Sequence, residues 1–163
     1  MQLTIRTAKR TDGAKIWKLI KAVGTLDLNS EYCYFILSDF FSGTCLIAEG
    51  EAGSLLGFVT CFVPPKEKNT LFVWQIGVDQ KVQGRGIAGQ LLDLLIQHQG
   101  KKLEKVKTTI SDDNKASQHL FRSFAKRHKA IMVKSEFIRS EDFEGEHEAE
   151  YLYTVQLETR KTK

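Results

Sequence analysis

Three glycines near the middle of the chain have the spacing of a phosphate-binding turn. In QKVQGRGIAGQLLDLLIQ, residues 80–97, Gly84, Gly86 and Gly89 spell G-x-G-x-x-G, and a segment with helical apolar periodicity follows at once. Glycines let backbone N–H groups approach an anion closely, and the N-terminus of a helix favours negative charge. This stretch therefore predicts a loop that binds a phosphate group.

Two common phosphate-binding motifs fit this stretch poorly. A dinucleotide fingerprint places its first glycine directly after a strand, whereas six residues separate the strand-like TLFVWQIG from Gly84. A Walker A loop needs a lysine and a hydroxyl residue after its last glycine, but Gln90 and Leu91 follow Gly89. The pattern Q-x-x-G-x-A, from Gln83 to Ala88, fits better, because small residues there let backbone N–H groups close on a pyrophosphate.

The elements that must position this loop follow from apolar periodicity and turn signals. We expect strands over 3–6, 44–50, 55–64, 70–78, 105–111, 130–135 and 149–157, helices opening at Thr11-Asp12 and covering 31–41, the stretch after the glycines and 115–128, and a charged loop over 136–148. The order β-α-α-β-β-β-α-β-α-β-β predicts an α/β chain with a mixed sheet, because three antiparallel strands precede a β-α-β-α unit.

This combination resembles the GNAT superfamily of N-acetyltransferases. Its acetyl-CoA loop reads [QR]-x-x-G-x-[GA], which Gln83 to Ala88 match, and its second cofactor segment begins with an asparagine, which Asn114 matches before KASQHLF. The resemblance implies one N-acetyltransferase domain over 1–163, with about seven strands, a splayed parallel pair and about four helices. It also implies that the pantetheine arm pairs with backbone near Ile76 and Val78. The implied acetyl-CoA residues are Ile76, Val78, Gln83, Gly84, Arg85, Gly86, Ile87, Ala88, Gly89 and Asn114.

Four further segments are more specific. LDLNSEYCYFILSDFFSGTCLIAE, GFVTCFVPP, TLFVWQIGVD and HEAEYLY together resemble the L-2,4-diaminobutyrate acetyltransferase family, from about residue 25 to 155. That family transfers acetyl from acetyl-CoA to the γ-amine of L-2,4-diaminobutyrate. The product, N4-acetyl-L-2,4-diaminobutyrate, is the precursor of the compatible solute ectoine. The resemblance also implies a homodimer that needs no metal; HEAEY lacks the second histidine of a zinc helix.

A substrate with two ammonium groups and one carboxylate needs acidic partners. We expect Asp27, Tyr32, Trp74, His147 and Glu150 to bind it, with His147, Glu150 and Asp27 as catalytic candidates. Each has a plainer alternative. Asp27 could be a turn residue, Tyr32 and Trp74 could pack in the core, and neighbouring Glu31 fits an exposed first helical turn. His147 and Glu150 are three apart, so either the last strand begins after His147 or only one of them points inward.

Two departures from the usual GNAT pattern affect the proton transfers. The strand before the loop, FVWQI, has no glutamate to act as the base, and Phe121 stands where many relatives carry a tyrosine acid. Ser117 and Tyr153 remain candidate proton donors. A GNAT acting on another small amine or a protein N-terminus, and a non-catalytic acyl-CoA-binding module, are the alternative functions.

Composition limits the class of protein, its partners and its cellular location. The chain has 163 residues with 42% hydrophobic and 27% charged residues and a net charge of +4, which is typical of a globular protein. Its basic tracts are short and lack interleaved aromatic residues, so we expect no nucleic-acid partner. No signal peptide or membrane-spanning apolar run is evident, and three widely spaced cysteines indicate reduced thiols. We therefore expect a cytoplasmic protein in which Cys45 and Cys61 are small buried hydrophobes.

Overall fold

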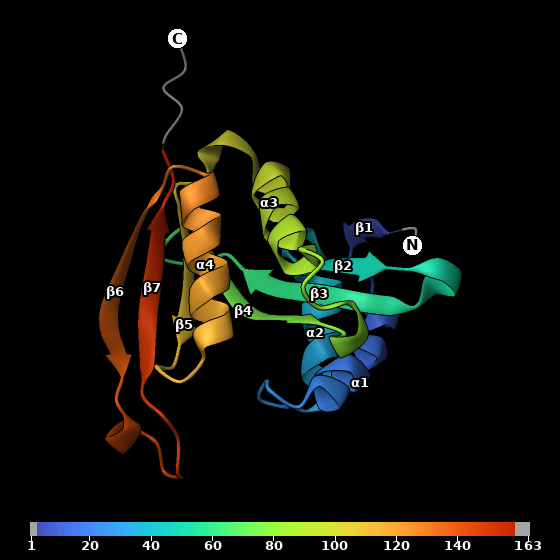
Figure 1. The fold of residues 1–163 in the computed structure, drawn as a ribbon, viewed down its shortest axis with the longest axis horizontal. Helices are drawn as coiled ribbons and strands as arrows, with labels where there is room; N and C mark the ends of the chain where they lie inside the picture. Colours follow the sequence, from blue (N-terminus) through green and yellow to red (C-terminus); the bar gives the residue numbers. More distant parts are fainter. Residues whose placement is uncertain (1–2, 159–163) are drawn as a thin grey trace. The chain divides into compact units, whose positions relative to one another are not determined.

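Seven strands and four α-helices make up the part of the chain that the computed structural model describes, residues 3–158. In chain order they are β1 (Thr4–Thr7), α1 (Gly13–Val23), α2 (Glu31–Phe40), β2 (Leu46–Glu49), β3 (Leu55–Phe62), β4 (Thr70–Val78), α3 (Ile87–Gln99), β5 (Lys105–Ile110), α4 (Lys115–Arg127), β6 (Ile131–Ile138) and β7 (Glu150–Gln156) (Figure 1). Short 3-10 turns join several of them. The order of elements predicted from the sequence is confirmed.

The strands form one mixed sheet in the order β1-β2-β3-β4-β5-β7-β6. The pairs β1–β2, β2–β3, β5–β7 and β6–β7 are antiparallel, whereas β4 and β5 are parallel. The parallel register covers only Thr70–Val73 against Lys105–Thr108, and β4 runs on to Val78 beyond it. The predicted mixed sheet with a parallel pair is confirmed.

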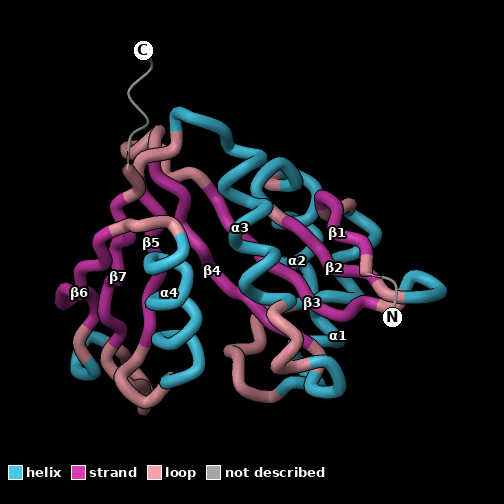
Figure 2. Tube along the Cα trace, turned by 45° about the horizontal axis from the view of Figure 1, so that its top comes forward, coloured by secondary structure: helices cyan, strands magenta, loops and turns pink. Residues whose placement is uncertain are grey.

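The chain divides into two compact units, and the division falls inside β4. Unit 1 comprises Met1–Phe62 and Trp74–Gln99, and unit 2 comprises Val63–Val73 and Gly100–Lys163. In unit 1, α1 and α2 pack on each other and both contact β3 (Figure 2). In unit 2, α4 packs against β6, and β7 lies between β5 and β6.

Each unit has its own buried apolar residues. In unit 1, Ile16 and Ile20 of α1 pack with Tyr34, Ile47 and Phe58. In unit 2, the fully or nearly fully buried side chains include Leu71, Val106, Phe121, Phe124 and Val155. Phe121 thus serves packing, in keeping with a residue that has no proton to donate.

Helix ends follow the capping signals in the sequence. Gly24 ends α1 in the left-handed conformation, at φ 71°, which glycine adopts without steric cost. The Asn114 side chain accepts a hydrogen bond from Ser117 N at 3.0 Å and caps α4 as predicted. Ser30 occupies the cap position of α2 but makes no side-chain capping bond.

One boundary prediction is wrong. Residues 136–138 were expected in a charged loop, yet β6 continues to Ile138. Glu136 pairs with Tyr151, and Ile138 pairs with Glu150 across an irregularity in the register. Because β6 is an edge strand, the Glu136 side chain stays in solvent while its backbone pairs with β7. A charged residue is therefore compatible with the strand, and the charge of this segment was a poor signal for its end.

The cysteines behave as the sequence predicts. All three are free thiols, and Cys45 and Cys61 are fully buried. Burial raises the pKa of Cys45 to about 11 and the pKa of Cys61 well above its ordinary value. Over residues 3–158, each helix is too short or too polar to cross a membrane.

Candidate active site

The glycine loop leads directly into α3 within unit 1. Gly84 and Gly86 both have left-handed backbones, at φ 76° and 77°, and Ile87 begins the helix. A side chain added at Gly84 would meet no atom within 4 Å, and one at Gly86 would meet only the Gln90 amide. The glycines are therefore required by backbone conformation, and the space before the helix stays open.

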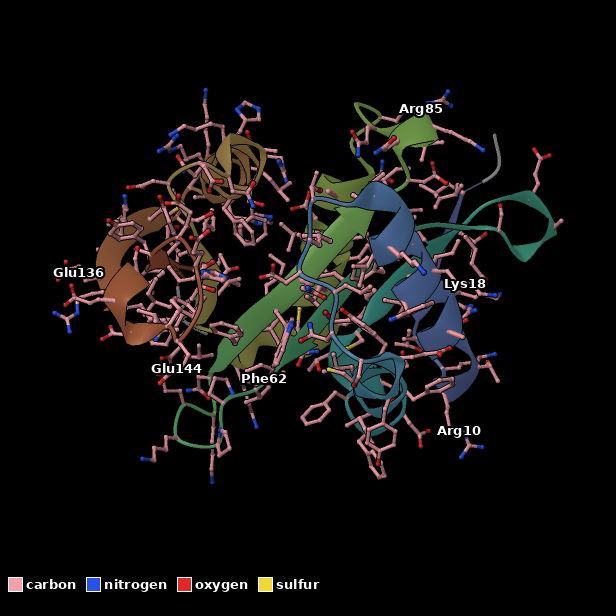
Figure 3. The ribbon with its side chains drawn as sticks, turned by 90° about the horizontal axis from the view of Figure 1, so that it is seen from below. Arg10, Lys18, Phe62, Arg85, Glu136 and Glu144 are labelled. Atoms are coloured by element: carbon pink, nitrogen blue, oxygen red, sulfur yellow. The ribbon has the colours of Figure 1, made fainter. Side chains whose placement is uncertain are left out.

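Anion-binding features gather at this helix start. Residues Gln83 to Gly86 are exposed, and Figure 3 shows Arg85 at the periphery of unit 1. The Gln83 amide donates to Val78 O at 3.2 Å, which ties the loop to the end of β4. Since the first N–H groups of a helix have no partner within it, the turn containing Ala88 and Gly89 can bind a phosphate.

The end of β4 carries the residues predicted to accompany this loop. Ile76 and Val78 are half-buried. Trp74 is 44% exposed, so the alternative of core packing is wrong, and its ring meets the edge of Phe62 at a centroid distance of 6.1 Å. Gln75, its neighbour, is only 8% exposed, as expected for alternation along a strand.

Asp27 lies in the loop between α1 and α2. Asp27 is exposed to solvent, and its backbone carbonyl accepts a 2.7 Å hydrogen bond from Nε2 of Gln75. The Tyr34 hydroxyl donates to Oε1 of Gln75 at 3.0 Å, and Asn29 N donates to the same hydroxyl at 3.3 Å. A buried amide and a buried phenol thus hold a loop that bears a carboxylate.

One acidic and one aromatic residue at the start of α2, Glu31 and Tyr32, are both exposed. Tyr32 is 72% exposed, so the alternative that places it in the core is wrong. Glu31 is exposed in the first turn, where the helix dipole stabilises a carboxylate, as predicted.

His147 and Glu150 both lie in unit 2, where β7 begins at Glu150, so the alternative in which the strand starts after His147 is correct. The His147 ring stacks on Phe143 at 4.0 Å with an interplanar angle of 19°. Its Nδ1 lies 2.7 Å from Glu148 O. A carbonyl only accepts hydrogen bonds, so Nδ1 is the donor in this contact, which fixes the orientation of the ring.

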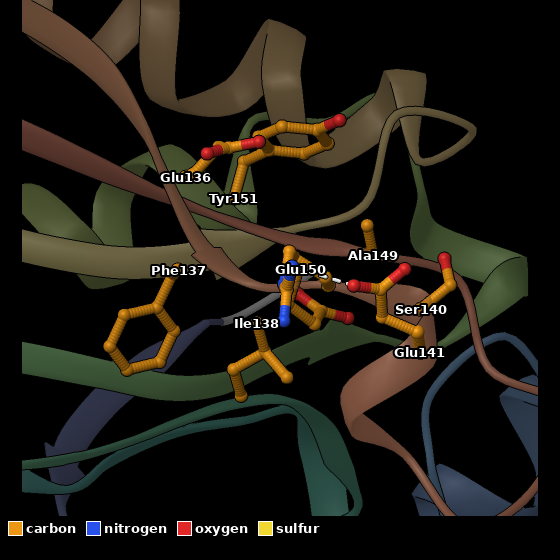
Figure 4. Close-up of a pocket in the computed structure, with 9 residues that line it drawn as sticks. Glu136, Phe137, Ile138, Ser140, Glu141, Ala149, Glu150 and Tyr151 are labelled. Atoms are coloured by element: carbon orange, nitrogen blue, oxygen red, sulfur yellow. Dashed lines mark ion pairs between the residues drawn. The ribbon is translucent and has the colours of Figure 1, made fainter.

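Glu150 lines a shallow recess between the end of β6 and the start of β7 (Figure 4). Glu136 and Glu141 also line it, together with a single cation, Arg139. Arg139 pairs with Glu141 at 2.6 Å and with Asp142 at 3.1 Å. Lys134 Nζ lies 3.8 Å from the centroid of the Tyr151 ring, which also lines the recess, so Glu150 stands among charges of both signs.

The candidate proton donors differ in accessibility. Tyr153 is buried in β7, at 2% exposure. Ser117 lies in the first turn of α4 beside the cap residue Asn114, whose side-chain oxygen is already used for capping.

In residues 3–158 there is no group of three or more His, Cys, Asp or Glu side chains that could hold a metal ion.

Sequence reasoning missed Gln75 and Tyr34. Within unit 1 they connect β4 and α2 to the Asp27 loop, although neither was a site candidate. One signal was present: Gln75 is the only amide side chain in the mostly apolar TLFVWQIGV, and a buried polar side chain requires a partner.

Comparison with known proteins agrees with both resemblances. The sequence model of the acetyltransferase (GNAT) family matches residues 15–125. The L-2,4-diaminobutyric acid acetyltransferase of Marinococcus halophilus is 40% identical over 146 residues, 88% of this chain and 84% of its own. The one from Streptomyces anulatus is 40% identical over 156 residues, 94% of this chain and 89% of its own.

Solved structures agree as well. The diaminobutyrate acetyltransferase EctA of Paenibacillus lautus, in complex with its substrate L-2,4-diaminobutyric acid and coenzyme A, has a TM-score of 0.90 and 36% identity, covering 96% of this chain and 95% of its own. The NatC complex bound to Gag peptide and CoA has a TM-score of 0.76 at 17% identity, covering 96% of this chain and 99% of its own, and shares the fold alone. This chain belongs to the GNAT acetyltransferase family and, within it, to the L-2,4-diaminobutyric acid acetyltransferases.

Proposed function

We propose that this enzyme transfers the acetyl group of acetyl-CoA to the γ-amine of L-2,4-diaminobutyrate and releases N4-acetyl-L-2,4-diaminobutyrate, the precursor of ectoine. The similarity to the Paenibacillus lautus enzyme, at a TM-score of 0.90 and 36% identity over 96% of the chain, carries this proposal. That protein was solved with this substrate and coenzyme A.

Acetyl-CoA fits the loop before α3. The left-handed glycines Gly84 and Gly86 leave open space at a helix N-terminus, which suits a pyrophosphate. We assign the phosphates to Gln83–Gly89, the pantetheine arm to backbone at Ile76 and Val78, and a further contact to Asn114.

The reacting amine must lose a proton before it attacks. With a pKa near 10.4, roughly 0.04% of an alkyl amine is neutral at pH 7, a handicap of about 4–5 kcal/mol. We assign the base to His147, because imidazole is the most common general base in enzymes and this ring is oriented by its stack on Phe143 and by the contact of Nδ1 with Glu148 O. The nitrogen–carbon bond then forms, the carbon–sulfur bond breaks, and the electron pair leaves with sulfur; the second proton that the nitrogen gives up in becoming an amide converts the CoA thiolate into free CoA thiol.

Selectivity for the γ-amine requires that the α-amine be held. We assign the two ammonium groups to Asp27 and Glu150, and the walls of the binding site to Tyr32 and Trp74. The position of Glu150 in the lining of a recess and the exposure of Asp27, Tyr32 and Trp74 support these roles.

The proposal also covers the domain organisation, the oligomeric state and the cellular location of the enzyme. The family match over residues 15–125 draws on both units, which supports treating 1–163 as one acetyltransferase domain. We further propose a cytoplasmic homodimer. Ile131, Val133 and Phe137 are exposed apolar residues on alternate positions of edge strand β6, which supports self-association. Light scattering after size exclusion would give about twice the 18.5 kDa chain mass for a dimer.

A single assay tests the activity. Acetyl-CoA-dependent release of free thiol is measured with L-2,4-diaminobutyrate, ornithine, lysine, spermidine and a short peptide in parallel. We expect strong preference for diaminobutyrate and an N4-acetyl product by NMR. Turnover only with another amine would overturn the substrate, and acetyl-CoA binding without turnover would favour a binding module.

A further inference from the structure

The loop that carries Asp27 lies between helices α1 and α2. It connects Gly24, which ends α1, with Ser30, which precedes α2 and makes no side-chain capping bond. Asp27 and Leu28 are both exposed. A carboxylate that must face one ammonium group of a small substrate needs a fixed backbone, because an error of about 1 Å weakens a charged hydrogen bond severely.

Two buried side chains supply that constraint from outside the loop. Gln75 donates from Nε2 to Asp27 O at 2.7 Å, and Tyr34 accepts from the backbone N and the side-chain Nδ2 of Asn29 at 3.3 Å each. Tyr34 also donates to Oε1 of Gln75 at 3.0 Å, so the two groups orient each other. The anchors are 48 and 5 residues from their loop partners.

Burial makes this pair sensitive to small changes. Tyr34 is fully buried and Gln75 is 8% exposed. If the phenol oxygen were removed, Gln75 Oε1 and both Asn29 donors would lose a partner in a place where water substitutes poorly. The Gln75 main chain is held separately, since the Thr60 hydroxyl donates to Gln75 O at 3.3 Å.

We propose that Tyr34 and Gln75 form a buried clamp that positions Asp27 for one ammonium group of the substrate. The clamp rests on the proposed function, in which Asp27 binds that group. Both are positioning residues, because they act on the substrate through the Asp27 backbone. Gln75 follows Trp74 on β4, so the strand that carries one proposed wall of the site also fixes the loop.

The central variant is Tyr34→Phe, which removes one oxygen atom and keeps the ring. We expect KM for L-2,4-diaminobutyrate to rise about tenfold, with KM for acetyl-CoA unchanged. Gln75→Glu keeps the acceptor for Tyr34 but removes the donor to Asp27 O, and we expect the same pattern. Thr60→Val is the matched control, because it removes a buried hydroxyl bonded to Gln75 without touching the loop; it should lower Tm and leave KM unchanged.

Two further measurements separate positioning from general destabilisation. In an Asp27→Asn background, Tyr34→Phe should raise KM no further, because the clamp acts through that carboxylate. Amide hydrogen exchange over residues 25–30 should accelerate in Tyr34→Phe and stay at the wild-type rate in Thr60→Val.

Each outcome decides something. An additive effect in the Asp27→Asn background, or an unchanged KM in Tyr34→Phe despite faster exchange, would overturn the clamp. If the wild-type enzyme fails to acetylate L-2,4-diaminobutyrate, the proposed function falls, and the exchange rates alone then decide whether Tyr34 and Gln75 hold the loop.

Discussion

The Asp27 loop in unit 1 and the hairpin end carrying His147 and Glu150 in unit 2 are held in different ways. The loop is fixed by buried side chains, one of which lies 48 residues away in sequence. The hairpin end is fixed by local contacts: Arg139 pairs with Asp142 three residues on, and His147 stacks on Phe143. One segment therefore depends on the interior of its unit, and the other depends on its own surface residues.

This difference has a consequence for mutation. A buried hydrogen bond leaves an unsatisfied partner when it is broken, whereas an exposed one is replaced by water. We therefore expect changes to the buried side chains that hold the Asp27 loop to affect folding and function together, and changes at the hairpin end to affect function with little effect on stability.

The sharpest test of the hairpin end is Glu150→Gln, which removes the charge and keeps the size. A hydrogen bond to a charged group contributes about 1.5–3 kcal/mol, so we expect kcat/KM for L-2,4-diaminobutyrate to fall about 100-fold. Affinity for acetyl-CoA and Tm should remain at wild-type values. Steady-state kinetics and thermal unfolding measure both.

Glu136→Gln is the control for this change, because Glu136 lines the same recess on the paired strand. It should lower kcat/KM far less. Equal losses in the two variants would mean that the field of the recess, rather than Glu150 itself, selects the substrate.

Gly86→Ala tests whether unit 1 also holds its cofactor loop through backbone conformation. A left-handed alanine costs about 1–2 kcal/mol, and Gly86 has φ 77° directly before α3. We expect KM for acetyl-CoA to rise about tenfold while KM for diaminobutyrate stays nearly constant.

Gly100→Ala in unit 2 is the matched control, since Gly100 has φ 72° and open space around it. It should lower Tm by a similar amount without changing KM for acetyl-CoA. A rise in that KM in both variants would show that general destabilisation, and not the loop, is responsible.

Local signals made most of the fold and part of the site predictable. The bounds of β4 were predicted to the residue, and the Asn114 cap and the left-handed Gly24 follow from residue type and position. The loop Gln83–Gly86 was likewise predicted because its conformation depends on its own glycines. The family assignment was also correct, since it rests on short segments in a fixed order.

What the sequence could not reveal depends on distant partners. Gln75 and Tyr34 are 41 residues apart, and although a buried glutamine requires a partner, the sequence does not identify Tyr34 as that partner. The end of β6 was missed for a similar reason: Glu136 lies in strand because Tyr151 pairs with it. The assignment of roles to His147, Glu150 and Asp27 stays a prediction that the kinetic variants must decide.

Two arginines with carboxylate partners, one in each unit, allow the contribution of ion pairs to stability to be compared between the units. Arg6 bonds both Asp12, which is 1% exposed, and Glu49, at 2.8 and 2.6 Å. Arg139 pairs with Glu141 and Asp142 on the surface of unit 2. Arg6→Met should cost about 1–3 kcal/mol of unfolding free energy, whereas Arg139→Met should leave Tm almost unchanged, as measured by denaturant and thermal unfolding.

The pH dependence of Arg6→Met follows from the two carboxylates. Burial tends to raise the pKa of Asp12, but hydrogen bonds from Arg6 and Lys9 N outweigh it and lower that pKa; the Arg6 guanidinium also lowers the pKa of Glu49. Their contribution is complete above the ordinary carboxyl range near pH 4 and is lost as pH falls through the lowered values. The difference between wild type and Arg6→Met should therefore be largest at neutral pH and shrink below about pH 4. A constant difference across this range would exclude the ion pairs as its source.

The smallest effect concerns how firmly the interior of unit 1 is closed, which the cysteines report because Cys33, Cys45 and Cys61 all lie in that unit. Burial raises the pKa of all three thiols, and with a pKa of about 11 only roughly 0.1% of Cys45 is thiolate at pH 8. A thiol-reactive disulfide reagent at pH 8 should modify half-buried Cys33 slowly. Cys45 and Cys61 should react only as fast as unit 1 opens, whereas in denatured protein all three cysteines of the chain should react. Fast labelling of Cys45 or Cys61 in the native enzyme would mean that the interior opens readily. The clamp on Asp27 would then be too loose to account for the contrast between the two segments.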